Sequence, residues 1–139
     1  MGNQWNNRLL AVLCAIVVGM MLSSPAWSHH GTNISYDHDN PITVKATVSE
    51  FRFSNPHAQI YFDVKDDKGN VQHWNGELTN PSNLMRNGWT KKRSESELPP
   101  GTPLTITMAP SKAGTHTGVV LKIINEKGEQ VLLGRERPQ

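Results

Sequence analysis

Histidine is the residue type in this chain best suited to do chemistry, and all six histidines follow an apolar N-terminal segment. They are His29, His30, His38, His57, His73 and His116. Imidazole nitrogens bind transition metals, and copper(II) favours nitrogen ligands in a tetragonal arrangement. The sequence contains no nucleophile elbow, phosphate-binding loop or His-Glu-x-x-His motif. We therefore expect a binding protein without catalytic activity.

The first 28 residues have the pattern of a cleavable signal peptide. Arg8 precedes a continuous apolar run, Leu9–Leu22, and the small residues Ala26 and Ser28 suit the positions before a cut. The run is shorter than the roughly 20 residues that a membrane-spanning helix needs. We therefore predict a periplasmic protein with no stable membrane span after cleavage.

A cut after Ser28 creates a chemically distinctive terminus, because His29 then carries both a free amine and an imidazole. A histidine of the β domain could supply a third nitrogen. The resulting set of three nitrogens would resemble the histidine brace of several exported copper proteins. The hypothesis is a site for copper(II) or another transition metal. Its candidate ligands are His29, His30, His57, His73 and His116. His57 and His73 belong to neighbouring predicted strands, so we expect them to come close.

Two alternatives to this brace remain open. A cut after Ala26 would leave Trp27-Ser28-His29 at the terminus, and a third-position histidine binds copper(II) through the amine, two backbone amides and its imidazole. The His-rich end can also be a polar terminus with adventitious metal affinity.

The residues after the cut predict a polar arm followed by one small mainly β domain. Residues 29–41 are polar and without periodicity, and residues 42–139 carry alternating apolar and polar positions. The expected strands cover residues 42–53 (with a bulge near Glu50), 57–64, 71–78, 104–108, 119–123 and 131–133. One short helix is expected to begin after Asn80-Pro81 and to stop at Gly88, with a polar loop over 90–97. This order predicts an OB-like Greek-key β-barrel of five to six strands with its helix between strands three and four.

A polar row on the barrel wall supplies a second functional hypothesis. His73, Asn75 and Glu77 share one face of the third strand. A possible ligand face combines Asn75 and Glu77 with Trp89, although Trp89 is also suited to packing between the barrel and the helix. The alternative function is a periplasmic binding module for a protein, peptide or saccharide partner, with no metal.

Charge argues against nucleic-acid binding. The whole chain has a formal net charge of +2, and Arg8 is the only charged residue before the cut, which leaves about +1. A nucleic-acid-binding domain is expected to carry a basic patch and a high net positive charge.

Several motifs together resemble one protein family. They are the His29-His30 start, Asn55-Pro56-His57-Ala58, Trp74 with Glu77, Pro81-Ser82-Asn83-Leu84, and Gly88-Trp89-Thr90. This combination is similar to a family of small exported bacterial proteins catalogued as a domain of unknown function. The resemblance covers essentially the whole mature chain, and it implies export and a small β domain but no particular activity.

Overall fold

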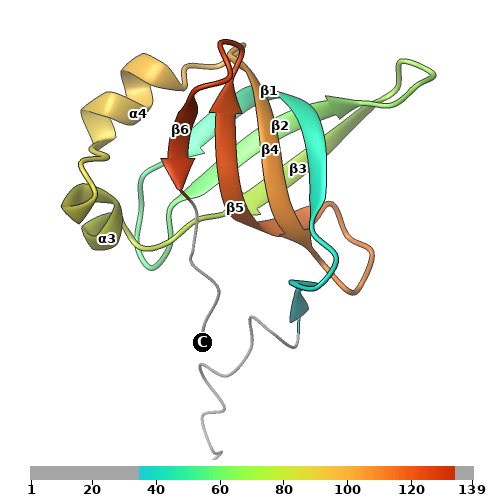
Figure 1. Ribbon diagram of the computed structural model, residues 1–139, viewed down its shortest axis with the longest axis horizontal. Coiled ribbons are helices and arrows are strands. Elements are labelled where there is room, and N and C mark those ends of the chain that lie inside the picture. The colour runs from blue at the N-terminus through green and yellow to red at the C-terminus, as the bar shows by residue number, and fades with distance from the viewer. Residues whose placement is uncertain (1–34, 134–139) are drawn as a thin grey trace, which may run out of the picture. The chain divides into compact units, whose positions relative to one another are not determined.

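A computed structural model describes residues 35–133, which form six strands and two short helices (Figure 1). In chain order the elements are β1 (Ile42–Arg52), β2 (Gln59–Lys65), β3 (Val71–Glu77), α3 (Pro81–Arg86), α4 (Lys91–Glu97), β4 (Pro103–Pro110), β5 (Thr117–Asn125) and β6 (Gln130–Leu133). The predicted signal peptide and the candidate ligands His29 and His30 lie outside the described residues. Across residues 35–133, no helix combines the length and apolar character needed to cross a membrane.

Five of the strands close into a barrel. The strand order is β3-β2-β1-β4-β5-β6, with antiparallel neighbours throughout, and a further parallel pairing joins β3 to β5. β6 pairs only with β5 and lies outside the closed barrel. This connectivity confirms the predicted OB-like Greek-key barrel, and closure protects the edges of β3 and β5 that an open sheet would expose.

β1 follows the predicted alternation and its predicted irregularity. Ala46 and Val48 are buried, whereas Lys45, Thr47 and Ser49, which alternate with them, are exposed. The register with β2 shifts between Val48 and Glu50, where the chain carries one extra residue. The bulge changes the parity of the apolar positions, so that Phe51 and Phe53 pack against the core.

The interior of the barrel at β3 is shaped by one large and one minimal residue. Trp74 is partly buried and lies over Phe62, with 6.4 Å between the ring centroids. Two residues on, Gly76 fills the next inward position, where an added Cβ would lie 2.6 Å from Val120 Cγ2 and 3.0 Å from Ile60 Cγ2. A side chain at this position would collide with the core.

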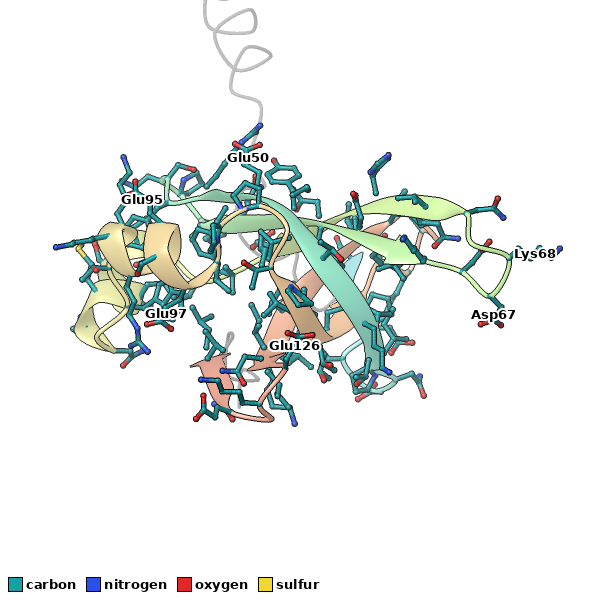
Figure 2. The ribbon with its side chains drawn as sticks, turned by 90° about the horizontal axis from the view of Figure 1, so that it is seen from above. Glu50, Asp67, Lys68, Glu95, Glu97 and Glu126 are labelled. Atoms are coloured by element: carbon teal, nitrogen blue, oxygen red, sulfur yellow. The ribbon has the colours of Figure 1, made fainter. Side chains whose placement is uncertain are left out.

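The prediction of a single short helix is wrong, because two helices connect β3 to β4. α3 begins as expected, with Asn80 as N-cap accepting a hydrogen bond from the Asn83 amide. It stops before Gly88, which has a φ of +77°. The expected loop over 90–97 instead forms α4, because Thr90 caps it by accepting from the Arg93 amide. Figures 1 and 2 show both helices at one side of the barrel, away from the β2–β3 turn.

Replacing Gly76 with Ala should destabilise the barrel. We expect Gly76→Ala to lower the free energy of unfolding by about 1–3 kcal/mol, the usual cost of overpacking a core. Urea unfolding followed by tryptophan fluorescence measures the change. Asn75→Ala is the matched control on the outward face of the same strand, and it should have little effect. Equal stability of Gly76→Ala and the unaltered protein would contradict the described packing.

Candidate functional site

The predicted polar row exists and extends across two strands. The register pairs Gln59 with Glu77, Tyr61 with Asn75, and Asp63 with His73. The residues between them on both strands point inward, so these six side chains face outward. We call this surface, together with His57, the outer β2–β3 face.

His57 and Glu77 form a close pair at one end of the outer β2–β3 face. His57 Nδ1 lies 2.8 Å from Glu77 Oε1, and the two side chains are 33% and 21% exposed. Backbone hydrogen bonds between Ala58 and both Thr79 and Leu78 hold the chain beside them. A carboxylate at Nδ1 fixes the orientation of an imidazole and leaves Nε2 to face a ligand.

His73 forms a similar pair with a carboxylate at the other end of this face. Its Nδ1 lies 2.6 Å from Asp63 Oδ1, and its side chain is 83% exposed. Because His73 is four residues from Glu77 along β3, the two histidines are separated by about 13 Å of strand. The expectation that His57 and His73 come close is therefore wrong, since one metal ion needs ligand nitrogens about 2 Å from itself.

His116 lies on the other side of β3. Its ring stacks on Trp74, with centroids 5.0 Å apart and planes at 26°. Trp74 faces the barrel interior, whereas Asn75 and Glu77 face outward. The structure therefore brings no two of His57, His73 and His116 together.

Trp89 is not part of the outer β2–β3 face. It is 3% exposed and belongs to the core cluster, where its ring lies 6.5 Å from that of Phe51. Its indole Nε1 donates to the Ser94 hydroxyl at 2.7 Å, and the Arg93 guanidinium covers the ring. Packing between the barrel and the helices, the other role foreseen for Trp89, is the one observed.

Tyr36 is a site residue that the sequence pattern did not reveal. The backbone of Ser35–Asp37 docks on the chain between β4 and β5, through Asp37 N–H to Pro110 O at 2.8 Å and Lys112 N–H to Ser35 O at 2.9 Å. The Tyr36 phenol hydrogen-bonds with Thr117. Burial, and secondarily the negative charge of Glu77, raises the pKa of Tyr36 above its usual 10.0. The last residues of the polar arm are thus fixed close to Glu77, and a lone tyrosine in a polar arm gave no periodic signal of this contact.

A network of polar side chains continues the outer β2–β3 face onto β1. Arg52 donates to both carboxylate oxygens of Glu50, at 2.7 and 2.9 Å, which lowers the pKa of Glu50. The Arg52 guanidinium also lies 4.6 Å from the centre of the Tyr61 ring, and the Tyr61 hydroxyl donates to Gln59 at 2.7 Å. This network orders the surface beside the Gln59–Glu77 pair.

Within residues 35–133, no three His, Cys, Asp or Glu side chains gather closely enough to hold a metal ion. The brace hypothesis takes two nitrogens from His29, which precedes Tyr36 by seven residues. Seven extended residues span about 23–25 Å. A segment of this length sets an upper limit of about 23–25 Å on the distance between His29 and Tyr36.

Comparison with known proteins identifies a family for this sequence and no close relative of known activity. Residues 17–122 match the model of a family described as a family of unknown function, DUF6152. This match confirms the resemblance to an uncharacterised family. No curated protein and no solved structure matches the chain significantly.

The contact between Tyr36 and Glu77 can be tested by titration. The chain has two tyrosines, so Tyr61→Phe leaves Tyr36 as the only phenol. In this variant we expect the ultraviolet absorbance of the phenolate to appear at a midpoint above 10.0, because burial and Glu77 both disfavour the charged form. Adding Glu77→Gln should lower that midpoint, since it removes the neighbouring negative charge.

Glu95→Gln, on α4, is the control for this titration and should leave the midpoint unchanged. If Glu77→Gln leaves the midpoint of the Tyr36 titration unchanged, the described docking of the arm close to Glu77 is contradicted. Because the pKa of Tyr36 is raised, this residue contributes stability that is fully present below its unfolded pKa. That contribution is lost progressively as the pH rises from the unfolded pKa through the higher folded pKa.

Proposed function

This chain belongs to the DUF6152 family, and we propose that its exported form binds copper(II) between its new N-terminus and the outer β2–β3 face. The amine and imidazole of His29 supply two nitrogens, and Nε2 of His57 supplies the third. The observation that carries the proposal is the His57–Glu77 pair, 2.8 Å apart, beside the docked arm. Export to the periplasm is part of the proposal, because signal cleavage creates the amine.

The choice of His57 as the third ligand rests on its position. Among the three barrel histidines, His57 pairs with the carboxylate that also acts on Tyr36. His73 has an equally close carboxylate but is at the far end of the strand pair. His116 is stacked on Trp74, on the opposite side of β3. His57 is therefore the choice, because it combines an oriented imidazole with the carboxylate whose charge acts on Tyr36.

The chemistry of these donors favours copper(II) over other metals. An amine and two imidazoles form a nitrogen-rich set, and copper(II) takes such ligands in a tetragonal arrangement. Glu77 then acts as the outer partner that holds the tautomer and orientation of His57. All three donors must be deprotonated to bind, so copper affinity should fall as the pH is lowered.

The test compares the mature protein beginning at His29 with the same protein acetylated at its N-terminal amine. We expect acetylation to weaken copper(II) binding by more than about tenfold, because it removes the amine from the chelate of amine and imidazole. Glu77→Gln should weaken binding by about 10–100-fold, as loss of an outer carboxylate partner usually does. Competition titration gives the affinities, and electron paramagnetic resonance reports the nitrogen ligands.

His73→Ala is the matched control, because it removes a carboxylate-paired histidine from the wrong end of the same strand pair. It should leave affinity and spectrum unchanged, whereas His57→Ala should alter both. Equal affinity with and without the acetyl group would overturn the brace. If natively exported protein begins at Trp27 and His57→Ala has no effect, copper is held by the terminal Trp27-Ser28-His29 segment instead, and this proposal is wrong.

A further inference from the structure

A groove with both polar and apolar lining residues lies at the end of the barrel strands that is remote from His57. It has a volume of about 690 Å³ and is bordered by β1, β2, β4 and the β5–β6 turn. Gln59 and Lys65 mark opposite ends of β2, so about 20 Å of strand separates this groove from the His57–Glu77 pair. The inference below is independent of the proposed metal site.

Two lysines, Lys45 and Lys65, line the groove from neighbouring strands. The β1–β2 ladder ends at the pair Thr47–Asp63, and Lys45 and Lys65 follow two residues further along on the two strands. Both lysines are exposed and line the groove. Within residues 35–133, neither lysine makes a hydrogen bond or ion pair. Like charges on neighbouring strands destabilise a sheet unless something neutralises them.

Two hydroxyls adjoin these lysines. Thr47 and Thr105 line the same groove on β1 and β4, and Thr105 pairs with Lys45 across the strands. In the part of the chain that the structure describes, the hydroxyls of Thr47 and Thr105 also lack hydrogen bonds to protein. The groove therefore presents two cationic donors beside two hydroxyls that can donate or accept.

The acidic residues of the groove limit what it can bind. Asp63 is engaged by His73 at 2.6 Å, and Glu126 lies on the β5–β6 turn (Figure 2). Two carboxylates near two ammonium groups would repel a polyanion such as nucleic acid. One oxyanion can still bind between Lys45 and Lys65, since both lysine side chains are flexible and can turn toward it.

We infer that this groove binds a small hydroxylated molecule carrying a single oxyanion group, such as a sugar phosphate or a uronic acid. Lys45 and Lys65 hold the oxyanion, and Thr47 and Thr105 contact hydroxyls of the ligand. The volume of the groove lies in the range of small-molecule sites. Phosphate and carboxylate share this recognition chemistry, and separate probes distinguish them.

Calorimetric titration with glucose 6-phosphate, glucuronate, inorganic phosphate and glucose tests the inference. At least one of the two sugar anions should bind saturably, and glucose should not. The double variant Lys45→Gln/Lys65→Gln should weaken that binding by about tenfold or more. Thr47→Val/Thr105→Val should weaken the sugar anion but not inorganic phosphate.

Lys68→Gln/Lys92→Gln is the charge-matched control, because both lysines are exposed and lie outside the groove. Figure 2 shows Lys68 at the tip of the β2–β3 turn. This control should bind as the unaltered protein does. Lys45→Gln/Lys65→Gln should keep or slightly raise the melting temperature, since it removes a repulsion. Absence of binding by both sugar anions, or equal losses in the two lysine variants, would overturn the inference.

Discussion

The structure depends on one short parallel contact, the pairing of β3 with β5 that closes the barrel. The pairing has three registered steps, Asn75–Thr117, Gly76–Gly118 and Glu77–Val119. Its middle step joins two glycines. An added Cβ would lie 2.6 Å from Val120 Cγ2 at Gly76 and 2.8 Å from Met108 Sδ at Gly118. β3 and β5 can pair here because neither Gly76 nor Gly118 has a side chain that would collide with the core.

Closure also determines which side chains share a surface. It sets Thr117 beside Asn75, and the chain between β4 and β5 packs against Ser35–Asp37. Tyr36 then hydrogen-bonds with Thr117 and lies close enough to Glu77 to be affected by its negative charge. The same junction places His116 on Trp74, toward the other side of β3. One contact of six residues thus separates the polar outer β2–β3 face from the stacked pair of Trp74 and His116.

Local sequence patterns were sufficient for the barrel and insufficient for the site. Alternation located the strands, and the change of parity after Val48 located the bulge. The register between strands cannot be read from such local patterns, because it depends on the pairing partner and on the turn between the strands. His57 and His73 belong to adjacent strands, yet the register assigns them to different carboxylates at opposite ends.

The other differences between expectation and structure have two separate causes, one local and one tertiary. α4 has a mainly polar sequence without an apolar face, and it is stabilised by the Thr90 cap, the Arg93–Glu97 pair and the bond from Trp89 to Ser94. Tyr36 docks through backbone hydrogen bonds, which no side-chain pattern encodes. α4 is thus encoded locally by a cap and short-range pairs rather than by apolar periodicity, whereas the docking of Tyr36 depends on residues 110–112, which are distant in the sequence.

Glu77 connects the docked end of the arm to the oriented histidine. Its carboxylate lies 2.8 Å from His57 Nδ1, and its negative charge also raises the pKa of Tyr36. Tyr36 in turn is held by the backbone hydrogen bonds of Ser35–Asp37. The register of β3 fixes the position of this carboxylate, and two residues far apart in the sequence share one electrostatic environment because of it.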